Sequence, residues 1–367
     1  MLKLNCGLSY PEQNAEQELR KIILANKYEV DYVSIISIDK ERTKWFWEVV
    51  KSSFNFNEHA FSMMPDANFK LCSAPLYESV MFNEDIMETI KRHYSYGVKA
   101  MTFHTTPVEL IKDAVKNGFI VNSRGGIFSA DLDYNPIITK WAQIVMFCIE
   151  HDIEIFIGTS LRPGACENEL SEYTIKDLIH ACDFYDRAVN YYKAAGKIKN
   201  PSEAPIYLET LGHVRAWNLK KYEEILKYRK ICAIGPLLTD AVNGFDELNA
   251  IIGYTYVKSS TTLNLWVECM LSRKEHIELP NVEDVEDEIK KWKVAELVND
   301  VTKRYIEGSE NHDEKKVLEV KGQQRTQCSA HYNIFGAMDI IPTCNVCGNK
   351  CPLTSEKLRK VGGNGLN

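Results

Sequence analysis

Short apolar runs alternate with longer helical patterns along most of the chain, and this alternation restricts the possible folds more than any other feature. Between the runs, apolar residues recur at the i, i+3, i+4 spacing of amphipathic helices. Eight strand–helix repeats favour a parallel sheet closed into a (β/α)8 barrel of the TIM type over an open sheet. The predicted strands are 2–5, 31–36, 69–73, 99–103, 119–121, 154–157, 205–208 and 231–234. The predicted helices include 15–26, 85–93, 108–116, 137–150, 175–194 and 219–228.

The C-terminal part of the chain has a different pattern. Residues 283–306 continue the helical spacing after the last predicted strand, whereas residues 307–327 are charged, contain Gly and are weakly apolar, which is typical of a linker. We therefore expect a barrel domain over residues 1–306, a linker over 307–327 and a small C-terminal segment over 328–367.

Composition excludes several classes of protein. The net charge is −7, with 44 basic and 51 acidic residues and no Lys/Arg block, so we expect no nucleic-acid partner. The first residues have no signal-peptide pattern and no apolar run approaches ~18 residues, so we expect no membrane span. The 11 cysteines are scattered and odd in number, which favours metal or cluster chemistry in a reducing cytoplasm over a disulfide scaffold.

Three cysteines near the C-terminus have ligand spacing. Cys344, Cys347 and Cys351 read C-x2-C-x3-C, the mirror of the C-x3-C-x2-C run of common radical SAM (S-adenosylmethionine) enzymes. Three thiolates can hold three irons of a [4Fe–4S] cluster and leave the fourth open to a small molecule. A structural zinc site needs a fourth ligand, for which Cys328 or His331 is available. Spacing alone leaves both interpretations open.

Polar side chains follow the predicted strands at their carboxyl ends, where barrel enzymes carry their active sites. Any one of them is most simply a satisfied polar group at the start of a loop, but their shared position favours an active site. These residues are Asn5, Ser34, Tyr77, His104, Ser123, Arg124, Thr159, Arg162, Glu209 and His213.

Two arginines lie on loops rich in Gly and Pro after the fifth and sixth predicted strands. Arg124 lies in Ser-Arg-Gly-Gly and Arg162 in Leu-Arg-Pro-Gly. A guanidinium on such a loop can bind a phosphate or carboxylate through two hydrogen bonds, which predicts a small anionic substrate. The alternative is that each arginine pairs with a local carboxylate.

His213, after the seventh predicted strand, and His276 are candidate metal ligands, because two neutral imidazoles can hold a divalent cation and leave positions open for substrate. The residues alone favour ordinary surface or core histidines, since nothing in the spacing requires these two to meet. Cys269 lies in an apolar context, which is typical of a packing residue; a redox role is the alternative.

Five motifs occur together between residues 5 and 351: Ser-Arg-Gly-Gly at 123–126, Leu-Arg-Pro-Gly at 161–164, Glu-Thr-Leu-Gly-His at 209–213, Gly-Pro-Leu-Leu-Thr-Asp at 235–240, and the segment 274–280 around Lys-Glu-His. In their order and separations the chain resembles the phosphomethylpyrimidine synthase (ThiC) family. This is a non-standard radical SAM group that includes the 5-hydroxybenzimidazole synthases of cobamide synthesis.

The resemblance implies a homodimeric barrel enzyme whose C-terminal segment reaches the active site of the partner subunit. It implies S-adenosylmethionine, a [4Fe–4S] cluster on Cys344, Cys347 and Cys351, a Zn2+ or Fe2+ ion on His213 and His276, and an electron donor of the flavodoxin or ferredoxin type. The implied reaction is the rearrangement of 5-aminoimidazole ribonucleotide by a 5′-deoxyadenosyl radical. The implied substrate contacts are Asn5, Tyr77, His104, Ser123, Arg124, Gly125, Arg162 and Glu209, and the implied catalytic residues are Cys269, Glu209 and His104.

The chain departs from the family pattern at several positions. Its cluster run is one residue shorter than the family's C-x2-C-x4-C. Ser34, Thr159 and Cys232 stand where the family has a Met, an Asp and a Tyr that contact substrate. We therefore expect a divergent paralogue with the same radical initiation, making a thiamine pyrimidine, a benzimidazole or another product. A zinc-dependent barrel enzyme without radical chemistry and an inactive ribotide-binding paralogue are the alternatives.

Overall fold

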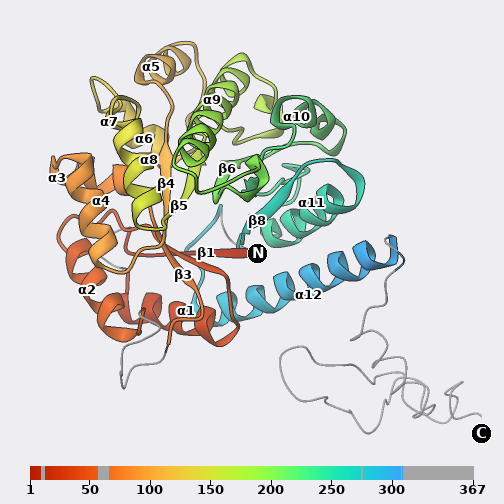
Figure 1. Cartoon of the computed structure of the whole chain (residues 1–367). Helices are drawn as coiled ribbons and strands as arrows, with labels where there is room; N and C mark the ends of the chain where they lie inside the picture. The colour runs from red at the N-terminus through yellow and green to blue at the C-terminus, as the bar shows by residue number, and fades with distance from the viewer. Residues whose placement is uncertain (10–12, 57–65, 274–275, 307, 309–367) are drawn as a thin grey trace, which may run out of the picture. The chain divides into compact units, whose positions relative to one another are not determined.

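The computed structural model describes residues 1–9, 13–56, 66–273, 276–306 and 308. Its centre is a closed barrel of eight parallel strands in chain order, surrounded by helices (Figure 1). Closure is made by β1 and β8, where Lys3 pairs with Cys269. The (β/α)8 prediction is therefore confirmed. The strands are β1 (Leu2–Cys6), β2 (Tyr32–Ile35), β3 (Lys70–Ser73), β4 (Ala100–His104), β5 (Glu154–Gly158), β6 (Ile206–Thr210), β7 (Ile231–Ala233) and β8 (Leu265–Cys269).

The helices that connect the strands coincide with the periodic segments of the sequence, although several boundaries differ. The pattern over 137–150 is divided by Lys140 into two helices, and two more helices lie between β4 and this pair. The helices are α1 (Ala15–Lys27), α2 (Thr43–Ser53), α3 (Pro75–Phe82), α4 (Ile86–Ser95), α5 (Val108–Lys116), α6 (Arg124–Ala130), α7 (Pro136–Thr139), α8 (Trp141–Glu150), α9 (Glu172–Ala194), α10 (Leu219–Leu226), α11 (Asp246–Ser260) and α12 (Val282–Ile306).

One predicted strand does not exist and one real strand was not predicted, so the predicted number of strands still matches the structure. Residues 119–121 form no strand: Ile120 is 74% exposed, and Phe119 packs beside Ile111 and Leu161 outside the barrel. The true last strand is β8, which the prediction missed. Its Glu268 breaks the apolar run in the sequence but is fully buried in the structure. As a result, the Arg124 loop follows β4, the Arg162 loop follows β5 and His213 follows β6.

The barrel interior is layered. Its lower layer is apolar and receives a side chain from every strand from β2 to β8. Above it lie the inward-facing polar side chains of Lys3, Thr102 and Glu209, all buried. A larger apolar core fills the space between strands and helices. The apolar layer therefore closes the bottom of the barrel and leaves the polar layer as the floor of a cavity.

The chain divides into two compact units, 1–295 and 296–367. In the first unit, the start of α12 buries Val285, Ile289 and Trp292, and the Trp292 indole N–H donates to the Leu271 carbonyl. Of the second unit, the structure describes only 296–306 and 308. Cys344, Cys347 and Cys351 lie outside the described residues, so the 307–327 linker and the 328–367 segment remain predictions. Among the helices of the described part of the chain, none is long and apolar enough to cross a membrane.

Candidate active site

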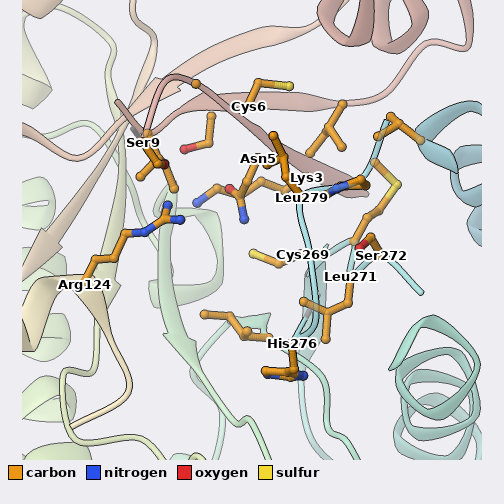
Figure 2. Close-up of a pocket in the computed structure, with 18 of the residues that line it drawn as sticks. Lys3, Asn5, Cys6, Ser9, Arg124, Cys269, Leu271, Ser272, His276 and Leu279 are labelled. Atoms are coloured by element: carbon orange, nitrogen blue, oxygen red, sulfur yellow. The ribbon is translucent and has the colours of Figure 1, made fainter. Parts of the chain in front are cut away.

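A cavity of about 680 Å³ opens at the carboxyl ends of the strands. Side chains from widely separated parts of the sequence converge there, including Lys3 and Asn5 of β1, Arg124 and His276 (Figure 2). Nine of the residues predicted from the sequence line this one cavity: Asn5, Ser34, Tyr77, Arg124, Arg162, Glu209, His213, Cys269 and His276. His104, Ser123 and Gly125 do not line it and lie in the layer behind. The barrel therefore brings together most of the predicted site, including the two histidines whose meeting the sequence alone did not favour.

Glu209 is the charged group at the floor of the cavity. Its Oε2 accepts a hydrogen bond from the Lys3 ammonium at 2.8 Å, and the Thr102 hydroxyl lies 3.3 Å from both partners. Burial alone would raise the pKa of Glu209, but the surrounding groups, Lys3 foremost and Arg162 with it, together outweigh burial and lower that pKa to about 2. Lys3 is 2% exposed, and although burial disfavours its charge, Glu209 raises its pKa well above the usual value. The floor therefore carries a fixed ion pair.

Tyr77 and His104 form a stacked pair beside the floor. The Tyr77 hydroxyl and His104 Nε2 are 3.0 Å apart, and the two rings stack at 5.7 Å. Burial lowers the pKa of His104 to about 4, so its imidazole is neutral at physiological pH. A Cβ added at Gly125 or at Gly158 would lie 2.3 or 2.6 Å from the His104 ring, so these two glycines create the slot that holds it. His104 thus orients Tyr77 from behind.

The two arginine loops present cations to the cavity. Ser123 caps α6 by accepting the Gly126 N–H, and its hydroxyl donates to the Ser160 carbonyl, which ties the Arg124 loop to the Arg162 loop. Arg162 donates to the Thr159 carbonyl. Within the described residues, neither Arg124 nor Arg162 forms an ion pair, so the local-carboxylate alternative is not supported there. Two unpaired guanidinium groups suit a phosphate.

His213 and His276 face each other across one edge of the cavity, with ring centroids 5.2 Å apart. Each Nδ1 contacts a carboxylate: His213 lies 2.5 Å from Asp240 Oδ1 and His276 lies 3.0 Å from Asp246 Oδ2. A carboxylate at Nδ1 fixes the proton there and leaves Nε2 free to bind a metal. The donor set therefore fits a divalent cation held by two histidines.

Two cysteine thiols lie close together at the floor of the cavity, one lining it and one behind. Cys269 lines the cavity, and its Sγ is 3.7 Å from that of Cys232, which is fully buried behind it. Ligand atoms of Glu209, Cys232 and Cys269 all lie within 4.8 Å of one another, so these three residues could also surround a metal ion. The Lys3 ammonium, however, already neutralises Glu209. The histidine pair is the better metal site because each of its members has a carboxylate partner and no competing cation.

Sequence reasoning missed Lys3, Asp240 and Asp246. Lys3 precedes Asn5 by two positions, so strand alternation places both on the same inner face; that signal was available. Asp240 ends the Gly-Pro-Leu-Leu-Thr-Asp motif. Asp246 had no signal, because only the fold brings the start of α11 to His276.

The three departures from the family pattern occupy different positions. Ser34 lines the cavity. Thr159 does not line it, since its hydroxyl donates to the Glu209 carbonyl at 3.1 Å. Cys232 lies behind Cys269. The side chains that differ from the family pattern therefore lie in the wall of the cavity or behind it.

Comparison with known proteins identifies the family of this chain. The model of the radical SAM ThiC family matches residues 2–357. A phosphomethylpyrimidine synthase from Desulfotalea psychrophila is 26% identical over 95% of this chain and 81% of its own length. Enzymes of the same name from Finegoldia magna (25%; 85% and 71% covered) and Sulfolobus acidocaldarius (26%; 98% and 86% covered) are similarly related. Among solved structures, dihydropteroate synthase from Thermus thermophilus aligns with a TM-score of 0.41 and 10% identity over 80% of this chain and 93% of that one, too low for a functional argument. The family match implies S-adenosylmethionine and an iron–sulfur cluster as cofactors.

Proposed function

The chain belongs to the radical SAM ThiC family, and from this premise we propose that it rearranges 5-aminoimidazole ribonucleotide, or a close analogue, by 5′-deoxyadenosyl radical chemistry. The observation that carries the proposal is the content of one cavity: two guanidinium groups that form no ion pair with any described residue, an ionised carboxylate and two histidines backed by carboxylates. That set matches a ligand with a phosphate at one end and a polar ring at the other.

Each group of the chain has a role in binding. Arg124 and Arg162 would bind the phosphate, since neither is neutralised by a carboxylate of the described residues. Glu209 would accept a hydrogen bond from the buried end of the substrate, and Asn5 and Tyr77 would provide further polar contacts. His104, Ser123 and Gly125, which match substrate contacts of the family, would act indirectly here. They lie behind the cavity lining and hold Tyr77 and the Arg124 loop in place.

The cofactors are assigned to residues by their donor chemistry. His213 and His276 would hold Zn2+ or Fe2+ through Nε2, and such an ion would act as a Lewis acid that orients a polar ligand. Cys344, Cys347 and Cys351, outside the described residues, would hold a [4Fe–4S] cluster that, with S-adenosylmethionine, supplies the radical. The chain itself positions the substrate and shields it from water, with the Cys269 thiol at the cavity floor.

We further propose a homodimer that is reduced by a flavodoxin or ferredoxin. A phosphorylated pyrimidine is the first product to test, because the named relatives are phosphomethylpyrimidine synthases. A benzimidazole is the second, since Ser34, Thr159 and Cys232 differ from the family's substrate contacts.

The test is anaerobic reconstitution of the full chain with iron and sulfide, followed by S-adenosylmethionine, dithionite and the aminoimidazole ribotide. Mass spectrometry should detect 5′-deoxyadenosine and a rearranged product, and the Cys347→Ser variant should form neither. Two zinc ions without sulfide would favour a non-radical zinc enzyme instead. Tight ribotide binding without turnover would favour an inactive paralogue.

A further inference from the structure

We propose that Lys3 is a positioning residue that fixes one oxygen of Glu209, so that the other oxygen meets the substrate only as a hydrogen-bond acceptor. The floor of the cavity would then select a ligand whose buried end carries a neutral donor, such as an amino or hydroxyl group, and reject one that carries a carboxylate there. This inference rests on the proposed function and adds the chemical class of the substrate's buried end.

The contacts of Lys3 support a positioning role. Its ammonium contacts Glu209 Oε2 at 2.8 Å and Thr102 at 3.3 Å, and it lies 4.3 Å from the centre of the Phe156 ring. An ammonium has three N–H donors, so these three contacts leave it little to offer a ligand. The side chain of Lys3 is 2% exposed. Lys3 therefore acts through Glu209.

Glu209 is held by one oxygen and open at the other. Both close partners, Lys3 and Thr102, contact Oε2, while Oε1 accepts no hydrogen bond from the described residues. The Glu209 side chain is 11% exposed and lines the cavity. The oxygen left over is thus the one that a ligand can reach.

The charges around Glu209 keep it ionised. Lys3 of β1 faces it and Arg162 after β5 adds positive potential, while His104 of β4, the Tyr77 hydroxyl and the thiols of Cys72, Cys232 and Cys269 complete the surroundings. Because these groups lower the pKa of Glu209 to about 2, the carboxylate cannot donate a proton at neutral pH. A carboxylate at the buried end of the ligand would be repelled by Glu209, because both groups are negatively charged.

The test compares two ligands by calorimetry on the full-length protein without S-adenosylmethionine: 5-aminoimidazole ribotide and its 4-carboxylate. The wild type should bind the first more tightly by about tenfold or more, as expected for a charge-assisted hydrogen bond. Lys3→Met should lose most of this preference, and its affinity for the first ligand should become pH-dependent as Glu209 protonates near neutrality. Lys230→Met is the matched control. Lys230 is also buried but donates to the Ala204 carbonyl away from the cavity.

A second readout needs no ligand. Difference infrared spectra of Lys3→Met at pH 7 should show a protonated carboxyl band that is absent from the wild type and from Lys3→Met/Glu209→Gln. If Lys3→Met does not fold, the double variant, which removes both charges, should bind the two ribotides about equally. Unchanged preference in either variant, or no new carboxyl band in Lys3→Met, overturns the proposal. If the wild type binds neither ribotide, the proposed substrate is wrong, and the infrared result alone decides the role of Lys3.

Discussion

The carboxylates behind the two histidines are not equivalent, and this difference gives a sharp prediction about metal affinity. Asp240 uses both of its oxygens: Oδ1 contacts His213 Nδ1 at 2.5 Å, and Oδ2 accepts the Cys166 N–H at 2.6 Å. Asp246 uses one oxygen twice, since Oδ2 contacts both the His276 N–H at 3.2 Å and His276 Nδ1 at 3.0 Å. Substitution by Asn therefore has different consequences at the two positions.

In Asp240→Asn, one of the two contacts must become unfavourable. If the amide oxygen faces His213, the amide nitrogen meets the Cys166 N–H, donor against donor. If the amide flips, its nitrogen donates to His213 Nδ1 and moves the imidazole proton to Nε2, the atom that would bind the metal. In Asp246→Asn, a single amide oxygen can accept both of the hydrogen bonds that His276 makes to Asp246, so of these two contacts only the charge is lost.

We expect Asp240→Asn to weaken metal binding by about 10- to 100-fold, or ~1.4–2.7 kcal/mol, the range found when a carboxylate partner of a metal-bound histidine is removed. Asp246→Asn should weaken it by only about 2- to 5-fold. Competition titrations of Zn2+ against a chromophoric chelator measure both, and the absorption of bound Co2+ reports the ligand geometry. Asp186→Asn, which alters an ion pair with Arg229 outside the cavity, is the control. Equal losses in the two variants, or a larger loss in Asp246→Asn, would refute the reasoning.

Two further substitutions test the surrounding framework. Burial would raise the pKa of Glu78, but His93, Arg92 and Trp47 together outweigh burial and lower that pKa to about 2. The pKa of Glu78 is therefore lower in the folded than in the unfolded protein. The stabilisation by ionised Glu78 is thus present above pH ~4.5 and is lost as the pH falls towards 2. Glu78→Gln should therefore destabilise the fold by ~3 kcal/mol at pH 7 and progressively less below pH 4.5, as measured by urea unfolding; a difference that does not change with pH would contradict this. Gly158→Ala places a Cβ 2.6 Å from the His104 ring and should weaken ribotide binding measured by calorimetry, because His104 can no longer hold Tyr77; unchanged affinity would show that the slot is not needed.

The sequence was most informative where a local pattern and a barrel position coincide. Residues at the ends of parallel strands must converge, so Asn5, Glu209 and Arg162 could be assigned to one site without knowledge of any contact. The direction of each side chain could not be assigned in the same way. His104 ends β4 but lies behind Tyr77, because the neighbouring Gly125 and Gly158 leave room for its ring there. The direction of the His104 side chain thus depends on residues of neighbouring segments, which the local sequence does not reveal.

Burial caused the errors in the strand prediction. The apolar run 119–121 suggested a strand, yet it only completes the turn after α5, where the Phe119 N–H bonds to the Ala114 carbonyl. In β8, the acidic Glu268 interrupts the apolar residues, yet it is fully buried and its Oε1 accepts the Gly235 N–H at 3.3 Å. Burial raises the pKa of Glu268 well above its usual value, and composition could not reveal that this acidic residue is buried.

The arrangement of retained and altered chemistry within the cavity favours a change of ligand rather than of reaction type. The arginines and the histidine pair that match the family line the cavity, and the arginines form no ion pair within the described residues. The departures lie beside and beneath the proposed substrate position: Ser34 at the wall, Thr159 bonded to the main chain and Cys232 against Cys269. A missing carboxylate at position 159 removes an acceptor worth ~1.5–3 kcal/mol to a ligand donor. In the proposed complex, Glu209, fixed by Lys3, would then be the anion at the floor that faces the buried end of the substrate. Discrimination between a pyrimidine and a benzimidazole precursor should therefore depend on Lys3 and Glu209 at the cavity floor. Substitutions at Lys3 should alter this discrimination more than substitutions at Arg124.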